Sequence, residues 1–256
     1  SRSLISFTYN HMLEYLCEEF ALPIYEIERW VPYFAKWAEV FTRAGLPFDN
    51  VLGVIDGHVQ QTSRPGGESC KKANFEDFQV FNGHDKVHAL KYLGLALPNG
   101  LVLLKGPWTG NRHDQACLNM SKMIEVLKIV FNLTGKSWMF FGDSAFTQGR
   151  HMQRMLKGKY LSHRELCFNA LMSRYRICIE NVFGEISNDW AFTSDFYNQK
   201  LGMQRVGQTY LVASLLHNCK TCFQGSQMSA QYGHDLLCDM HISKFLAISQ
   251  AAPFNV

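Results

Sequence analysis

The chain has 256 residues, of which 47% are hydrophobic and 18% are charged, as is typical of a globular protein with a sizeable core. These values exclude a disordered chain, a collagen-like fibre and a coiled coil. The formal net charge of +3 points to no class of partner by itself. No apolar run reaches the roughly 18–20 residues of a membrane-spanning helix, and no basic-then-apolar signal segment opens the chain.

The first 48 residues are predicted to be helical, because apolar side chains recur there at helical spacing. A second helix is expected over about 27–43, and Gly45 and Pro47 end the section. Residues 1–50 carry four basic and seven acidic side chains, so this section is not expected to lie on phosphates. Since the chain begins with Ser1 and not with Met, we expect it to be a piece of a longer protein.

From residue 51 onward, short apolar runs predict buried strands. The run 51–55 is expected to be a strand that ends at Asp56, and the run 138–141 a strand followed by Gly142 and Asp143. Together with the helical patterns around them, these strands predict an α/β layer built on a mixed sheet.

A hairpin is predicted between these two strands. Residues 87–97 and 101–105 would pair, with Pro98-Asn99-Gly100 as the turn. Helical patterns follow at four places, about 114–132, 148–157, 170–189 and 206–223. No internal repeat or long linker separates these parts.

Three acidic residues stand out by their settings. Asp56 and Asp143 each follow a buried apolar run, and Glu180 lies in an amphipathic helix. A buried carboxylate is costly unless a cation meets it, and oxygen ligands suit hard divalent cations. A single Asp after a strand is more often a turn former or a helix cap, so both interpretations stay open. Arg176 shares the helix face of Glu180, where it can either contact a phosphate or pair with that acid.

A basic segment lies between residues 149 and 176, with seven lysines and arginines against Glu165 alone. Such a charge excess suits a phosphate backbone, whereas the alternative is a solvated helix face. Arg150, Arg154 and Lys157 recur at the spacing of one helical stripe. We therefore predict that this stripe contacts DNA phosphates.

Eight cysteines are spread along the chain, which fits reduced thiols in a cytosolic or nuclear compartment better than a disulfide scaffold. Cys219-x2-Cys222 and Cys238-x2-His241 have the ligand types and pair spacing of a structural zinc site. Because 210–223 is predicted to be one apolar helix, and cysteines near helix ends are often core residues, no zinc site is expected.

The segment Ile55-Asp56-Gly57-His58 resembles the first signature of DDE transposases of the PIF/Harbinger type. The later motifs of that family have similar counterparts in the same order: Pro98-Asn99-Gly100-Leu101, Gly106-x6-His113-Asp114, Gly142-Asp143-Ser144-Ala145-Phe146, Phe168-Asn169, Arg176-x3-Glu180-x2-Phe183-Gly184 and Leu216-His217-Asn218. The resemblance covers about 51–225. One motif alone would be weak, and the ordered set is much more specific.

The resemblance implies an α/β fold of the ribonuclease-H-like kind, a mixed β-sheet flanked by helices, behind a helical N-terminal section. It divides the chain into three regions: the helical section 1–48, a DDE catalytic domain over 49–225, and a C-terminal segment 226–256 that packs on this domain or trails it.

The family pattern also implies a metal site. Its catalytic and metal-binding acids would be Asp56, Asp143 and Glu180, which would hold two Mg²⁺ or Mn²⁺ ions. Asp114 would be an accessory acid near the metals, although an acid in the first turn of a helix is also favoured by the helix dipole. His58 would either orient Asp56 or simply pack, and His113 accompanies Asp114.

The function that the resemblance implies is metal-dependent cleavage of DNA, as a transposase or a transposase-derived endonuclease, with strand joining by the same site in a full transposition cycle. The expected DNA contacts are Arg150, Arg154, Lys157 and Arg176. A domesticated, non-cleaving DNA-binding or chromatin scaffold and an RNA-directed nuclease are the alternatives. A Myb-like DNA-binding partner protein, a homo-oligomer and a nuclear location are further expectations, with no membrane partner.

Overall fold

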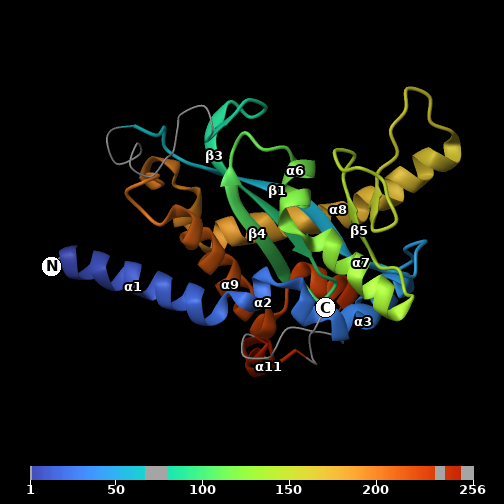
Figure 1. Ribbon diagram of the computed structural model, residues 1–256, viewed down its shortest axis with the longest axis horizontal. Coiled ribbons are helices and arrows are strands. Elements are labelled where there is room, and N and C mark those ends of the chain that lie inside the picture. The colour runs from blue at the N-terminus through green and yellow to red at the C-terminus, as the bar shows by residue number, and fades with distance from the viewer. Residues whose placement is uncertain (1, 67–79, 234–239, 249–256) are drawn as a thin grey trace.

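The structure, a computed structural model, describes residues 2–66, 80–233 and 240–248, and has a mixed β-sheet at its centre with helices on both faces (Figure 1). The strands are β1 (Val51–Gln61), β2 (Phe81–Asn82), β3 (Val87–Ala96), β4 (Val102–Thr109), β5 (Met139–Gly142) and β6 (Met152–Arg154). Their order across the sheet is β4-β3-β1-β5-β6, and the short β2 pairs with the start of β3.

The strand directions divide the sheet into two halves. β1, β3 and β4 are antiparallel neighbours, whereas β5 and β6 run parallel to β1. Parallel neighbours need a long crossover connection, which here runs through the helices between β4 and β5. The predicted ribonuclease-H-like mixed sheet is therefore confirmed.

Helices cover both faces of this sheet. The helical elements are α1 (Arg2–Phe20), α2 (Leu22–Tyr25), η1 (Ile27–Tyr33), α3 (Phe34–Arg43), α6 (Asp114–Ser121), α7 (Met123–Thr134), α8 (His163–Asp189), η2 (Ala191–Ser194), η3 (Phe196–Asn198), α9 (Val206–Gln224), η4 (Ser229–Gly233) and α11 (Ile242–Ala247). α6 and α7 pack on one face together with η1, and α8 packs on the other with the start of α9. Within the described ranges, no helix is long and apolar enough to cross a membrane.

The N-terminal section shares its core with the sheet. Trp30, Phe34 and Trp37 are fully buried in the same apolar cluster as Leu52 of β1. The helix predicted over about 27–43 is in fact two elements, η1 and α3, because a proline inside η1 removes one backbone donor. Nothing in the structure tests the predicted division at residues 48 and 225.

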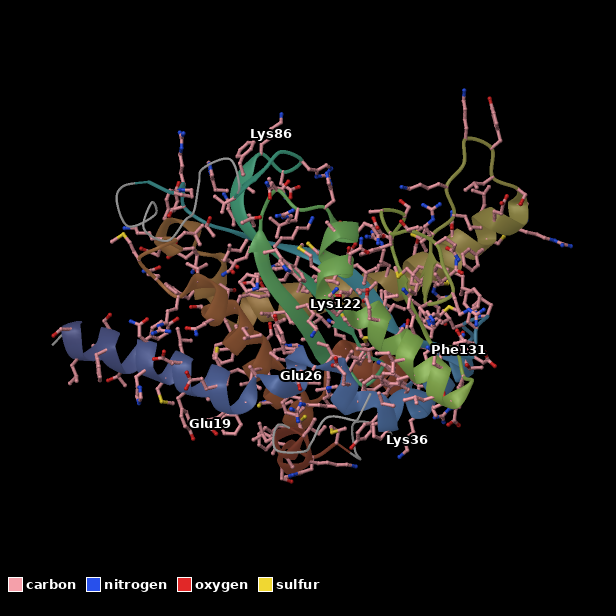
Figure 2. All side chains as sticks on the ribbon, in the orientation of Figure 1. Glu19, Glu26, Lys36, Lys86, Lys122 and Phe131 are labelled. Atoms are coloured by element: carbon pink, nitrogen blue, oxygen red, sulfur yellow. The ribbon has the colours of Figure 1, made fainter. Side chains whose placement is uncertain are left out.

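Two predicted helices differ from the structure: one is broken into two helices, and the other does not form. The helix predicted over 114–132 is broken at Lys122, which adopts a left-handed conformation between α6 and α7 (Figure 2). The helix predicted over 148–157 does not form: β6 lies there, and Met152 pairs with Phe140 of β5. Met152 is buried against the core, so sheet pairing overrides the helical periodicity of the charged residues.

The strand prediction is also corrected at Asp56. β1 does not end there, since its pairing with β3 continues to Gln61. Its parallel pairing with β5, however, ends at Ile55 opposite Gly142. The sheet therefore splits at Asp56, which keeps a neighbour on the β3 side and loses the one on the β5 side.

Other predicted elements are confirmed. β3 and β4 form the expected hairpin, and Gly100 in its turn has the positive φ of 87° that glycine allows without strain. α9 matches the expected 206–223. Within α9, the buried Asn218 amide exchanges hydrogen bonds of 2.9 Å and 2.8 Å with the backbone of Val102, so it attaches this helix to the edge strand β4.

Candidate catalytic site

Asp56 and Asp143 each follow one of two register partners on the parallel strands β1 and β5. Because Ile55 is the register partner of Gly142, the next residue on each strand is an aspartate, at the point where β1 and β5 separate. Asp143 Oδ1 accepts a hydrogen bond of 2.6 Å from the Ala145 backbone N–H, so the turn after β5 fixes this side chain. The two carboxylates thus emerge at one edge, as expected from the sequence.

Glu180 reaches the same edge from α8 through Arg176. The guanidinium of Arg176 lies 2.8 Å from Glu180 Oε1 through Nη2 and 3.6 Å from Asp56 Oδ2 through Nη1. Of the two roles considered for Arg176, pairing with Glu180 is the one present. A single cation therefore stands between an acid of β1 and an acid of α8.

The electrostatic environment of Asp56 is that of an acid cluster. Burial raises the pKa of its carboxyl to about 6, and the negative charges of Asp143 and Asp114 act in the same direction. The Gly57 backbone N–H and the Arg176 guanidinium oppose this rise. The charged form of Asp56 is therefore under-compensated, and added positive charge is favoured there.

Asp114 lies on the opposite face of β1, at the start of α6. Its Oδ1 is 2.7 Å from the Lys91 Nζ of β3. The pair is largely buried, with exposed side-chain fractions of 10% for Lys91 and 23% for Asp114. A Cβ on Gly57 would collide with the Asp114 carboxylate, so only glycine fits at this position of β1. The sequence carried no signal for Lys91.

The two histidines of the motifs do not contact the acids. The His58 ring packs between Phe183 and Tyr210, with centroid distances of 4.7 Å and 4.6 Å. Burial lowers the pKa of His58 to about 4, so it packs as a neutral ring. His113 is exposed at the N-terminus of α6, and its side chain makes no capping hydrogen bond.

The predicted basic stripe does not exist, because its residues lie on a turn, a strand and a loop. The Arg150 guanidinium lies 4.5 Å from the ring centroid of Phe131, which belongs to α7 and is labelled in Figure 2. Arg154 donates to the Ser144 carbonyl at 3.2 Å, and Lys157 is exposed. Of the four predicted DNA contacts, only Arg176 lies beside the acids.

A basic arm, residues 155–167, projects from the body of the molecule at the start of α8 (Figure 1). The Asn169 amide clamps its loop to α8 by exchanging hydrogen bonds of 2.8 Å and 2.9 Å with the Leu156 backbone. A capping box of Ser162 and Glu165 then starts the helix. The one acid of this basic segment is thus used in the cap, and the tip presents Lys157, Lys159, Tyr160 and Arg164 to solvent.

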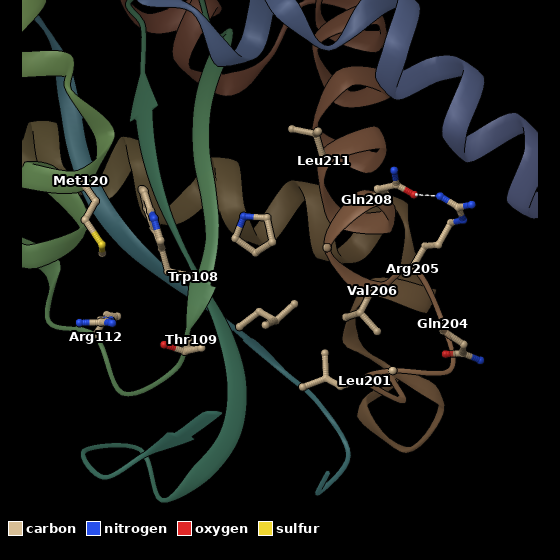
Figure 3. Close-up of a pocket in the computed structure, with 14 residues that line it drawn as sticks. Trp108, Thr109, Arg112, Met120, Leu201, Gln204, Arg205, Val206, Gln208 and Leu211 are labelled. Carbon is tan, nitrogen blue, oxygen red and sulfur yellow. Dashed lines mark hydrogen bonds between the residues drawn. The ribbon is translucent and has the colours of Figure 1, made fainter. Parts of the chain in front are cut away.

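A pocket of about 610 Å³ lies between β4 and the start of α9 (Figure 3). Its apolar wall includes Trp108 of β4 and Leu211 of α9, and Arg112 and Arg205 are among its polar residues. Trp108 is the register partner of Lys91. The pocket and the Lys91–Asp114 pair therefore share one stretch of the sheet.

The cysteine pattern considered for zinc is not described as a whole, because Cys238 lies outside the described residues. Cys219 and Cys222 are partly buried thiols of α9 that pack against the core. His241 begins α11, where its Nδ1 accepts a hydrogen bond from the Ser243 backbone N–H. The expectation that these residues bind no zinc stays a prediction.

The acids of this edge fit a divalent cation by their chemistry. Asp56, Asp143 and Glu180 offer carboxylate oxygens, the ligands that hard cations prefer. The rise in the pKa of Asp56 and the bridging Arg176 both indicate an edge that attracts positive charge. In the present side-chain conformations, no three Cys, His, Asp or Glu side chains of the described chain are grouped closely enough to hold a metal ion.

Comparison with known proteins gives one family. A family model described as DDE superfamily endonuclease matches residues 55–218. This match spans Asp56, Asp143 and Glu180, the elements from β1 into α9, and the Lys91–Asp114 pair. Neither the curated proteins nor the solved structures gave a match.

Proposed function

This chain belongs to the DDE superfamily endonucleases, and from that premise we propose that it cleaves phosphodiester bonds of DNA with the help of divalent cations. Within the family we propose the PIF/Harbinger type, on the strength of the ordered motifs from Ile55-Asp56-Gly57-His58 to Leu216-His217-Asn218.

The arrangement of three carboxylates carries this proposal. Asp56 and Asp143 follow paired residues on parallel strands, and Arg176 links Asp56 to Glu180. A protein that only binds DNA has no use for three acids at one sheet edge, because they repel phosphates. The three acids can take part in phosphate binding when they hold divalent cations, because the bound cations attract the phosphate.

Each residue then has a distinct task. Asp56, Asp143 and Glu180 would hold Mg²⁺ or Mn²⁺, which supply an activated water and neutralise charge on the phosphate. Arg176, once its acid partners are neutralised, is able to bind a phosphate oxygen through its planar donors. Asp56 must lose its proton before it can act as a ligand, so its raised pKa ties metal loading to pH.

The test is cleavage of supercoiled plasmid and of a labelled duplex, with and without Mn²⁺. We expect Asp56→Asn, Asp143→Asn and Glu180→Gln each to lower the rate at least about 10²-fold, because metal charge stabilisation is worth several kcal/mol. Glu39→Gln, which removes an exposed acid of α3, is the matched control and should cleave normally. Full Mn²⁺-dependent activity in a clean Asp56→Asn preparation would overturn the proposal.

The same assay with duplex RNA and an RNA–DNA hybrid separates the alternatives. A DNA endonuclease cleaves the DNA duplex and leaves the RNA duplex intact. An RNA-directed nuclease has the reverse preference. A non-cleaving scaffold binds DNA in gel-shift assays without metal-dependent cleavage of any of the three substrates.

We further propose that the basic arm holds the DNA backbone. Its exposed tip combines positive charge with Tyr160, whose side chain is 87% exposed, a combination suited to phosphates and bases. Neutralising Lys157, Lys159 and Arg164 together should lower the slope of log K against log salt by about 0.9 per lost contact on duplex DNA. Neutralising Lys122, Lys128 and Lys136, which lie just before, within and just after α7, is the control with the same charge change.

The remaining proposals concern partners and place. Leu4, Ile5 and Phe7 of α1 are exposed large apolar residues, which suits a contact with a second copy or with a Myb-like DNA-binding protein. A DNA substrate favours the nucleus as the working location. Co-purification from nuclear extract, with and without substitution of these three residues by Ser, tests both the proposed contact through α1 and the proposed location.

A further inference from the structure

Lys91 is a buried cation that the proposed cleavage chemistry does not use. It lies on β3 opposite Val59 of β1, and its side chain is 10% exposed. A buried ammonium is costly unless a nearby acid compensates it. Asp114 is that acid, at 2.7 Å from the Lys91 Nζ, and it comes from a different element, the first residue of α6.

The pair rests directly against the catalytic strand. The Asp114 carboxylate fills the space that a Cβ on Gly57 would need, and the Lys91 Cε lies 3.2 Å from that same position. The Gly57 backbone N–H donates a hydrogen bond of 2.8 Å to Asp56 Oδ1. An unbroken line of contacts therefore runs from the ion pair, through the Gly57 backbone, to the Asp56 carboxylate on the other face.

We propose that the Lys91–Asp114 ion pair positions Asp56 from the opposite face of β1, so that Asp114 is a positioning residue and not a metal ligand. This inference rests on the proposed function, because it assigns Asp56 to the metal site. Lys91 is the counter-ion that keeps Asp114 against Gly57 and keeps the pair neutral.

The contrast with a ligand role is one of charge. A ligand carboxylate must have negative charge to offer, and Asp114 already shares its charge with a buried lysine at ion-pair distance. The pair fills the space next to Gly57, and its two charges cancel. A neutral pair of similar shape should therefore replace it, whereas an uncharged amide in place of a ligand carboxylate binds a divalent cation more weakly.

The experiment measures Mn²⁺ affinity of the metal-free protein by calorimetry, without DNA. Asp114→Asn should weaken Mn²⁺ binding roughly 10-fold, as is typical when a residue supporting a metal ligand is lost, because the Lys91 ammonium is left unpaired against Gly57, whose backbone N–H holds Asp56. The double variant Lys91→Met/Asp114→Asn leaves no unpaired buried charge, so it should fold and recover affinity to within about threefold of wild type.

A matched control removes a pair of the same length elsewhere. Lys220 and Asp189 are 2.7 Å apart between α9 and α8, and Lys220→Met/Asp189→Asn should leave Mn²⁺ affinity unchanged. Gly57→Ala provides a second route, because it keeps both charges and displaces the Asp114 carboxylate. It should weaken Mn²⁺ binding as Asp114→Asn does.

Two results would overturn the inference alone. If the double variant binds Mn²⁺ as weakly as Asp114→Asn, then Asp114 is a ligand. If neither variant changes the affinity and only the melting temperature moves, then the pair is merely structural. If the wild-type protein itself binds no Mn²⁺, the proposed function fails together with the inference, and that pattern differs from the other two.

Discussion

Asp56 of β1 and Asp114 of α6, which lies against Gly57, are on opposite faces of β1, and their counter-ions differ. On the α8 face, Asp56 lies 3.6 Å from the nearest nitrogen of Arg176, which it shares with Glu180 and whose side chain is 33% exposed. On the α6 face, Asp114 lies 2.7 Å from a lysine that is 10% exposed. One carboxylate has a loose, shared and accessible cation, and the other has a close and buried one.

This difference indicates that the two faces of β1 differ in how easily their cations can be exchanged. A cation that water reaches is exchanged at little cost, since exposed ion pairs contribute little to stability. A buried pair is costly to break from either side. Asp56 is therefore suited to exchange the Arg176 guanidinium for another cation. The Lys91–Asp114 pair is suited to remain in place.

The largest expected effect comes from breaking the buried pair. Lys91→Met leaves the Asp114 carboxylate without its partner, so the free energy of unfolding should fall by about 3–5 kcal/mol. Urea denaturation of the metal-free protein measures this. A loss below about 1 kcal/mol would mean that the pair is solvated in practice and that the two faces do not differ.

A second prediction uses pH on the Asp56 face. Burial lowers the pKa of His58 to about 4 from its ordinary value of 6.5, so the fold favours the neutral ring. Its stabilising effect is complete above pH 6.5 and is lost as the pH falls toward 4. His58→Phe keeps the stacking and should reduce the loss of stability between pH 7 and pH 4 by about 3 kcal/mol. If this variant loses as much stability as wild type between pH 7 and pH 4, the His58 ring is not packed in its neutral form.

Asp56 should show the opposite sign. Burial raises its pKa to about 6 from its ordinary value of 3.8, so the fold favours the protonated carboxyl, and stability falls as the pH rises from 4 through 6. In metal-free protein at pH 7, Asp56→Asn should therefore be more stable than wild type by about 2–3 kcal/mol. The gain should disappear near pH 4. Thermal unfolding at both pH values, with chelator present, decides this.

The smallest expected effect is on Arg176. Because its side chain is partly exposed and its pairs are solvent-screened, Arg176→Met should cost at most about 1 kcal/mol in stability. The losses of unfolding free energy in Arg176→Met and Lys91→Met, measured under identical conditions, compare the two counter-ions directly. Equal costs for the two substitutions would show that Arg176 is as fixed as Lys91.

The sequence predicted those parts of the fold that depend on local pattern. Apolar runs indicated β1 and β5, and Pro98-Asn99-Gly100 indicated the hairpin turn. The spacing of Arg150, Arg154 and Lys157 predicted a helix that does not form, because pairing with β5 decides the structure there. Local propensity is a weak guide where a long-range contact competes with it.

The sequence indicated the acids of the candidate site and Arg176 beside Glu180, and it did not indicate Lys91. Asp56, Asp143 and Glu180 belong to motifs that a sequence displays. Lys91 lies in an apolar strand, far along the chain from Asp114, and nothing local marks the two as partners. The one available sign was Gly57 inside β1, since a glycine within a strand signals close approach by another group.

The parallel register of β1 and β5 also sets an order of events during folding. β1, β3 and β4 pair as neighbours along the chain, whereas Asp56 and Asp143 meet only after residues 62–138 have been closed into a crossover. Closing such a loop costs entropy that only the final contacts repay. A chain still emerging from the ribosome therefore keeps these two like charges apart. Their repulsion is therefore expected to arise only once β1, β3 and β4 have paired.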